Sequence, residues 1–195
     1  MSIVKKIKLR NDNYFYLLLL AKLLILLVLS FALTKRLSSQ EILASSISTI
    51  DGVTYSRDTK EPISGTVLSH WDNGQIYNKE IYLNGEKNGI SESFYKNGNK
   101  STSVSYKNGR KDGVDESFYE NGKLWTRKNY INGLQNGEYE TFFENGNPYY
   151  KGYYKNGKRD GLAEWFDESG EIWHRRYFKE GYETEFPEEL TRYVQ

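Results

Sequence analysis

Hydrophobic residues follow two different patterns along this chain. Residues 14–33, YFYLLLLAKLLILLVLSFAL, are nearly all apolar, with one charged interruption at Lys22. A helix of about 20 residues spans a bilayer core of roughly 30 Å, so this segment predicts a hydrophobic membrane helix. Beyond residue 50, short aromatic and polar runs alternate between Asn-Gly and Asp-Gly pairs. That second pattern is typical of β-strands joined by tight turns.

The flanks of the apolar segment predict its orientation. Four basic residues precede it between residues 5 and 10, and only Lys35 and Arg36 follow closely. The excess of positive charge places the N-terminus in the cytoplasm and the remainder outside. Two interpretations are open. The segment is either a retained signal anchor, which we favour, or a cleaved signal peptide that releases a secreted or periplasmic domain.

Three series of glycines repeat with a period of 24 residues. The series are Gly65, Gly89, Gly113, Gly137 and Gly161; Gly74, Gly98, Gly122, Gly146 and Gly170; and Gly85, Gly109, Gly133, Gly157 and Gly181. A repeat of this length indicates stacked supersecondary units. We predict an all-β fold, an elongated antiparallel sheet of five consecutive 24-residue β-hairpins, preceded by the N-terminal hydrophobic helix.

The turns predict which residues face each other. An Asn-Gly pair such as Asn121-Gly122 suits a two-residue type I′ turn, followed after the return strand by a tighter Gly-x-x-x-Gly loop such as Gly133 to Gly137. In each hairpin this register places an aromatic pair and an opposite-charge pair face to face. The predicted pairs are Phe118–Trp125, Glu116–Arg127, Phe142–Tyr149, Glu140–Lys151, Phe166–Trp173 and Glu164–Arg175. The same register sets Tyr106, Tyr130 and Tyr154 opposite Gly89, Gly113 and Gly137.

These patterns divide the chain into segments. Residues 1–13 are a basic N-terminal segment, 14–33 the transmembrane anchor or signal peptide, and 34–49 a polar linker or weak helix. Residues 50–61 and 182–195 are placed to cap the two exposed edges of the repeat array, residues 62–181.

Two of the units carry a family resemblance. The stretches YKNGRKDG, from Tyr106 to Gly113, and YKNGKRDG, from Tyr154 to Gly161, resemble MORN repeats in the shorter bacterial variant. The lead-in stretches DGVTYS, residues 51–56, and EPISG, residues 61–65, also resemble the start of such arrays. The resemblance implies a twisted sheet of successive hairpins. In eukaryotes it implies links to membrane junctions, lipids and dimeric scaffolds, and many bacterial relatives are labelled antitoxins.

Composition narrows the chemistry further. The net charge is +1, and residues 62–181 carry 17 basic and 17 acidic residues, which favours neither nucleic acid nor an anionic lipid surface. The chain has no cysteine and two histidines, His70 and His174, each of which takes the place of an aromatic residue in a column. The glutamates at 92, 116, 140 and 164 predict ion-pair ladders with lysine and arginine. We therefore predict no enzyme, no catalytic residue, no cofactor and no metal site.

The predicted function is binding of an unidentified protein partner through the sheet surface of a membrane-tethered repeat domain outside the cytoplasm. The candidate binding residues are Trp71, Tyr95, Tyr119, Phe143, Trp165 and Trp173. The candidate structural turn glycines are Gly74, Gly98, Gly122, Gly146 and Gly170. Two alternatives stay open: an antitoxin or immunity-type protein whose partner is a toxin, and a lipid-associated scaffold at the membrane. Residues 14–33 supply the membrane contact in each case where the anchor is retained.

Overall fold

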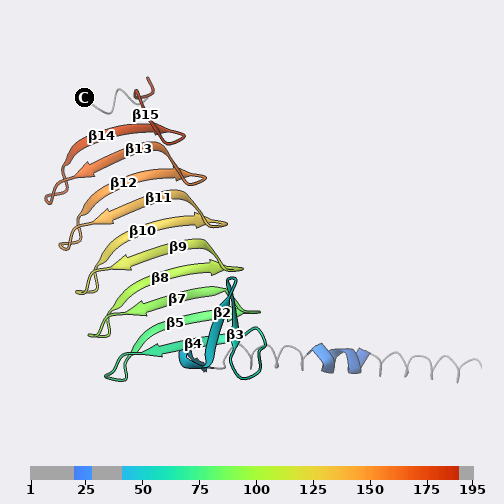
Figure 1. The fold of residues 1–195 in the computed structure, drawn as a ribbon. Helices are drawn as coiled ribbons and strands as arrows, with labels where there is room; N and C mark the ends of the chain where they lie inside the picture. The colour runs from blue at the N-terminus through green and yellow to red at the C-terminus, as the bar shows by residue number, and fades with distance from the viewer. Residues whose placement is uncertain (1–19, 28–40, 189–195) are drawn as a thin grey trace, which may run out of the picture. The chain divides into compact units, whose positions relative to one another are not determined.

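The structure is a computed structural model that describes residues 20–27 and 41–188 (Figure 1). The chain divides into two units, Met1–Gln40 and Glu41–Gln195. In the first unit, residues 20–27 form a helix with exposed side chains. The rest of the predicted segment 14–33, the basic segment 1–13 and residues 34–40 of the predicted linker lie outside the described residues. Among the residues that are described, no helix has the length and apolar character needed to cross a membrane.

The second unit is built on one sheet of thirteen strands, in which successive strands lie side by side in chain order (Figure 1). Its antiparallel strands are β4 (Gly65–His70), β5 (Ile76–Leu83), β6 (Glu86–Lys87), β7 (Gly89–Phe94), β8 (Lys100–Lys107), β9 (Arg110–Phe118), β10 (Leu124–Ile131), β11 (Leu134–Phe142), β12 (Pro148–Lys155), β13 (Lys158–Phe166), β14 (Ile172–Lys179) and β15 (Tyr182–Thr184). The described chain is mostly β, and its large, mostly antiparallel sheet of hairpin-like strands agrees with the coarse prediction.

The turn at Asn121-Gly122 is not the predicted type I′ turn. Gly122 donates its N–H to the carbonyl of Tyr119 at 2.9 Å, and Tyr119 donates to Lys123 at 2.8 Å. Gly122 has φ +86°, whereas Asn121 is outside the left-handed region. The turn is therefore a type I turn closed by a left-handed glycine, which adds one residue to the loop.

That extra residue makes the predicted aromatic pairs wrong. Phe118 lies opposite Leu124, and the register shifts at Trp125 before Thr126 pairs with Ser117. In the same way Phe142 lies opposite Pro148, and Phe166 lies opposite Ile172. The register shift at Trp125 offsets the additional residue in the turn. The charge pairs are therefore as predicted: Arg127 faces Glu116, Lys151 faces Glu140 and Arg175 faces Glu164.

The other series of Asn-Gly pairs makes the two-residue type I′ turns. Asn132 and Gly133 have φ of 49° and 84°, and the flanking residues Ile131 and Leu134 pair directly. The predicted Gly133–Gly137 loop is therefore wrong, since β11 already begins at Leu134. Gly137 lies within that strand, where the β10–β11 register shifts between Lys128 and Tyr130.

The N-terminal part of the second unit also departs from prediction. Residues 41–49, expected to be linker, form β1 (Glu41–Leu43), the 3₁₀ turn η1 (Ala44–Ser46) and most of β2 (Ile47–Ile50), which pairs with β3 (Val53–Ser56). They are ordered by packing: Ile42, Ala44 and Ile47 contact the buried cluster of Ile63, Val67 and Tyr82. β1 runs parallel to β4 and covers the first edge of the sheet.

Further elements lie beside the first and last hairpins of the array. Within residues 50–61, Thr54 donates its N–H to the carbonyl of Gly85 at 2.8 Å, which ties the β2–β3 hairpin to the turn after β5. Within 182–195, β15 pairs with β14. Residues 189–195 lie outside the described residues.

The sheet has two faces, which we name by the residues they carry. The ladder face carries Glu116, Arg127, Glu140 and Lys151, which lie opposite one another on successive strands. The alternating positions belong to the tyrosine face, which carries Tyr82, Tyr106, Tyr130, Tyr154 and Phe178. A second buried cluster, formed by Tyr150, Ala163 and Phe178 with Tyr139 and Trp165 against it, lies on the tyrosine face.

Candidate functional site

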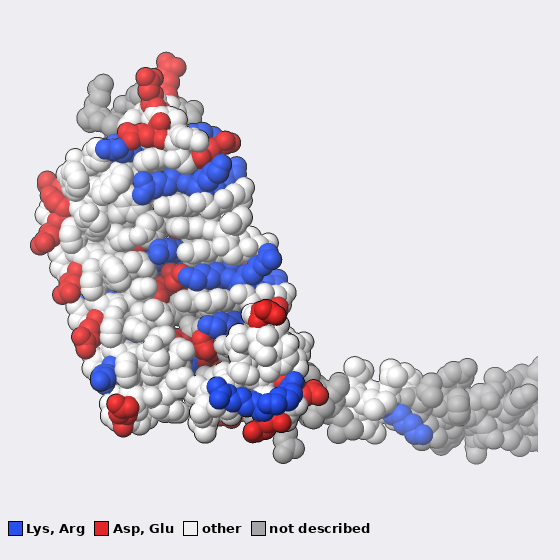
Figure 2. All heavy atoms as spheres, viewed as in Figure 1, with Lys and Arg blue, Asp and Glu red and all other residues white. Residues whose placement is uncertain are grey.

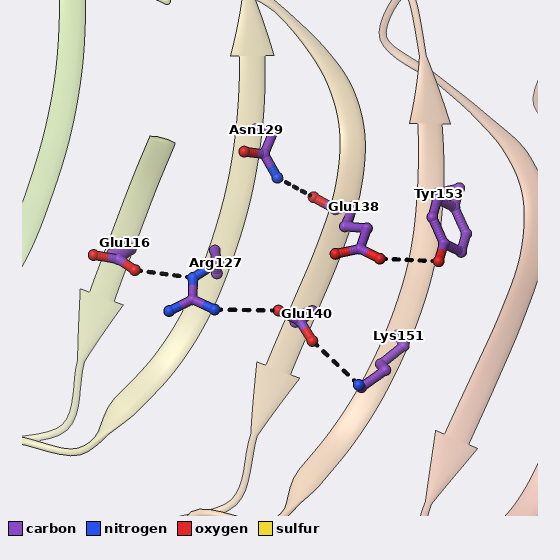
Figure 3. A network of polar contacts seen from close by, with 7 residues as sticks. All are labelled: Glu116, Arg127, Asn129, Glu138, Glu140, Lys151 and Tyr153. Atoms are coloured by element: carbon purple, nitrogen blue, oxygen red, sulfur yellow. Dashed lines mark hydrogen bonds and ion pairs between the residues drawn. The ribbon is translucent and has the colours of Figure 1, made fainter. Parts of the chain in front are cut away.

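Four charged side chains of the ladder face form a continuous network (Figure 3). Arg127 contacts Glu116 at 2.9 Å and Glu140 at 3.5 Å, and Glu140 continues to Lys151 at 3.4 Å. Beside it, Tyr153 donates its hydroxyl hydrogen to Glu138 at 2.9 Å. These groups satisfy one another, so the glutamate column is a structural ladder between strands.

The tyrosine face contains the predicted ring-on-glycine column. Tyr82, Tyr106, Tyr130, Tyr154 and Phe178 lie opposite Gly65, Gly89, Gly113, Gly137 and Gly161. Cations lie over three of these rings: Lys87 over Tyr106, Lys111 over Tyr130 and Arg159 over Phe178, each between 5.1 and 5.2 Å from the ring centroid. Burial, with the Glu80 carboxylate beside it, raises the pKa of Tyr82 to about 12.

Four of the predicted binding residues begin the turns, and three of them donate a hydrogen bond to the next repeat. The indole N–H of Trp71 donates to the carbonyl of Phe94 at 3.3 Å. The hydroxyls of Tyr95 and Tyr119 donate to Phe118 and Phe142 at 2.6 and 2.7 Å. Phe143 has no hydroxyl, and the link from its turn to the next repeat is made by Asn145 and Asn147, which donate to the carbonyl of Glu168 as Asn97 and Asn99 donate to that of Glu120. These polar atoms are therefore used within the fold.

The turn-start rings also pack on the rings at the bulges. Trp71 lies 4.5 Å from Tyr77, Tyr119 lies 5.9 Å from Trp125, and Phe143 lies 5.1 Å from Tyr149, all between centroids. The glycine that closes each of these turns has positive φ, from 82° at Gly74 to 98° at Gly146, which explains the series Gly74, Gly98, Gly122, Gly146 and Gly170.

Trp165 and Trp173 lie elsewhere, on β13 and β14. Trp165 packs on Tyr150 at 5.0 Å and on His174 at 5.1 Å between centroids. Trp173 stacks on His174 at 5.4 Å and is 61% exposed. The six predicted residues thus divide into a row of turn links and an aromatic cluster near the C-terminal end of the sheet.

The tyrosine face changes character along the array. One row across the strands reads Ser69, Asn78, Ser93, Thr102, Ser117 and Thr126 in the first half, and then Thr141, Tyr150, Trp165 and His174. Sequence reasoning missed Tyr139, Tyr150 and Arg159 in this second half. The signal that could have found them is the replacement of small polar residues by large rings at one repeat position.

Two shallow hollows open on this aromatic half. One, of about 170 Å³, is lined by Tyr139, Thr141, Tyr149, Tyr150, Arg159 and Trp165. The other, of about 400 Å³, is lined by Arg159, Trp165, Trp173, His174, Arg176 and Phe178. Burial raises the pKa of the Tyr139 and Tyr150 phenols, so both stay neutral at physiological pH. The surface therefore offers rings, phenols and guanidinium groups side by side.

The two margins of the sheet differ in which exposed charges predominate. Figure 2 shows acidic side chains along its left margin, where the type I turns lie. The exposed acidic residues of those turns include Asp72, Glu120, Glu144 and Glu168. The type I′ turns at the other margin are flanked by exposed cations: Lys107, Arg110, Lys155, Lys158 and Lys179. Exposed Lys96 and Lys123 at the type I turns and Glu180 at the other margin keep both edges mixed.

The fold and these surfaces define a repeat protein of β-hairpins whose linking side chains recur from unit to unit. Four segments of the chain match the family model of the MORN repeat variant: residues 87–108, 111–132, 135–156 and 159–180. The chain is similar to this family over these four units, and the first of the five predicted units lies outside the match. No curated protein matches the chain.

Proposed function

We propose that this chain is a non-enzymatic module that binds a protein partner through the surface of its sheet. The observation that carries the proposal is the aromatic half of the tyrosine face, where Trp173 is 61% exposed beside two open hollows. Tryptophan, tyrosine and arginine are the residues enriched at the centres of protein interfaces. MORN repeats are, in addition, modules that often mediate protein or membrane interactions.

Both faces of a single sheet are available to such a partner. Most polar side chains of the ladder face are already paired with one another, whereas rings are exposed on the tyrosine face. Truncating an exposed ring at the centre of an interface typically weakens binding by about 2 kcal/mol or more. The partner is therefore expected to lie mainly over the tyrosine face.

The partner can be sought by site-specific photocrosslinking in cells that produce the full chain. A photoreactive residue at position 173 reports on the tyrosine face, and one at position 153 reports on the ladder face. We expect a discrete protein adduct from position 173. The absence of an adduct from both positions would contradict the proposed function.

The second part of the proposal concerns location. We infer that residues 14–33 hold the repeat domain at the membrane on its extracytoplasmic side, or that they are cleaved and release it there. The basic residues ahead of this segment support that orientation. The test is a reporter enzyme that folds to its active form only outside the cytoplasm, fused after Gln195. We expect this fusion to show reporter activity. Activity of a cytoplasm-only reporter instead would contradict the orientation.

A further inference from the structure

The charge balance of the tyrosine face differs between its two halves. In the first half each cation of the ring column has an acidic partner: Lys87 pairs with Glu80, and Lys111 pairs with Asp115. In the second half Arg159 lies over the ring of Phe178. Among residues 41–188, no carboxylate lies within ion-pair distance of Arg159. The aromatic half therefore carries a guanidinium without a paired carboxylate among those residues.

Arg159 is at the centre of this half. Its side chain lines both hollows, its Nε donates to the hydroxyl of Tyr154 at 3.3 Å, and its guanidinium lies 5.1 Å from the centre of the Phe178 ring. These neighbours are neutral and hold the guanidinium in place without cancelling its charge. A pre-positioned guanidinium among rings is suited to a carboxylate that has apolar groups on either side of it.

The dimensions of the surface suit a short extended segment. The aromatic row runs from β11 to β14, which is three strand spacings or about 14 Å. An extended chain advances roughly 3.3 Å per residue, so about four residues cover that distance. Trp165 and Trp173 lie on neighbouring strands at one end of the row, where they can contact apolar side chains beside the acidic residue.

Phe186 and Glu183, near the C-terminal end of the described chain, have partners other than Arg159. Phe186 lies 6.3 Å from Tyr177 between ring centroids, and Tyr177 pairs with Leu162 on the ladder face. Glu183, on β15, already pairs with Arg176 at the rim of the larger hollow. An acidic group of the partner protein would match the charge of Arg159.

We propose that the tyrosine face of β11–β14 binds an extended acidic segment of the partner protein, in which a glutamate or aspartate pairs with Arg159 and flanking apolar side chains pack on Trp165 and Trp173. This inference rests on the proposed function and adds the site and the chemistry of the partner. The small polar residues in the first half of the same face leave that half without the ring surface, which confines the segment to the last two hairpins.

Binding is measured with the full-length chain in detergent and a fluorescently labelled hexapeptide of alternating glutamate and phenylalanine. A second peptide with lysine in place of glutamate is the matched probe. We expect saturable binding of the acidic peptide, at least tenfold weaker binding of the lysine peptide, and loss of affinity as salt is raised. Equal binding of the two peptides, or no binding of the acidic one, would overturn the inference.

Three variants locate the site. Arg159→Gln and Trp173→Ala should each weaken binding of the acidic peptide at least tenfold. Lys158→Gln is the matched control, because it makes the same charge change at the neighbouring position on the other face. Its affinity for the acidic peptide should stay within twofold of the wild-type value. Trp173 is largely exposed, so its removal keeps the test valid even if Arg159→Gln fails to fold. Wild-type affinity in Trp173→Ala and in a folded Arg159→Gln would overturn the inference.

Competition and crosslinking separate this inference from the proposed function. Vesicles containing anionic phosphatidylglycerol should not displace the acidic peptide, and displacement would mean that the site binds a lipid surface instead. A protein adduct from position 153 but not from 173 would leave the proposed function standing and refute the acidic-segment site. Adducts from neither position would refute both.

Discussion

The hydroxyl of Tyr119 donates a hydrogen bond of 2.7 Å to the backbone carbonyl of Phe142, one repeat further along the chain. Tyr95 makes the same bond to Phe118 at 2.6 Å, and Trp71 uses its indole N–H for Phe94. A ring that starts one turn thus satisfies a carbonyl at the end of the next outgoing strand. The link joins neighbours in an array whose stability depends on the contacts between adjacent units.

Tyr119→Phe should lower the free energy of unfolding by about 1 kcal/mol, because one hydrogen bond is lost while the ring packing is kept. Urea unfolding followed by circular dichroism measures the change. Tyr149→Phe is the matched control, since Tyr149 is an exposed ring of the same array. Its effect is expected to stay within about 0.5 kcal/mol. Equal destabilisation by the two substitutions would show that the Tyr119 hydroxyl has no special role.

Gly152 makes room for the ring of Tyr150. A Cβ at position 152 would lie 2.2 Å from the Tyr150 hydroxyl oxygen and 2.7 Å from Cζ. Gly152→Ala should therefore displace the ring and lower stability by about 1–3 kcal/mol. In a Tyr150→Thr background, with the residue found at the equivalent positions 102 and 126, the same substitution should be nearly neutral. Unfolding of the four proteins forms a double-mutant cycle, and additive effects would refute the clash.

The register of the charges could be predicted from the sequence, and the register of the aromatic residues could not. Glu116 faces Arg127 because an extra residue in the turn and an extra residue at Trp125 offset each other. An Asn-Gly pair is compatible with both turn types. The local pattern therefore does not decide between them, and it does not show the bond from Tyr119 to the next repeat either.

The candidate site was predicted in part for the same reason. Aromatic residues at the turns were interpreted as a binding surface, although Trp71, Tyr95 and Tyr119 use their polar atoms to join repeats. Trp165 and Trp173 do lie on the aromatic surface. Arg159 and Tyr150 were missed, since their common face becomes evident only once the bulges that shift side-chain alternation are known.

Glu140 bridges two cations on the ladder face (Figure 3). The Glu140 side chain is 13% exposed and lies between Arg127 and Lys151. Glu140→Gln removes its negative charge and leaves the two cations close together. A loss of about 1 kcal/mol is expected at low salt and a smaller loss in 1 M salt, because salt screens the pairs. Glu120→Gln, at an exposed turn position, is the control. A loss that is independent of salt would argue against an electrostatic ladder.

Asp160 predicts an acid-sensitive turn. Its carboxylate accepts the backbone N–H of Glu180 at 3.2 Å and the ammonium of Lys179 at 3.1 Å, and these bonds hold its pKa below the usual range. Because the pKa of Asp160 is lower in the folded than in the unfolded protein, the carboxylate stabilises the fold at pH values above its unfolded-state pKa, near 3.9. This stabilisation is lost as the pH falls through the folded-state pKa. NMR titration should find the lowered pKa, and Asp160→Asn should flatten the acid side of the stability profile. An unshifted Asp160 titration would contradict this account.

The two kinds of Asn-Gly turn should respond oppositely to glycine. Asn132 has φ 49°, a conformation that glycine adopts without strain, so Asn132→Gly should keep or slightly raise stability. Asn121 is outside the left-handed region, and its side chain accepts the N–H of Lys123 at 2.9 Å. Asn121→Gly loses that bond and adds backbone freedom, for a cost of about 1–2 kcal/mol. Urea midpoints of the two variants measure the difference, and the reverse order would mean that the turn types are exchanged.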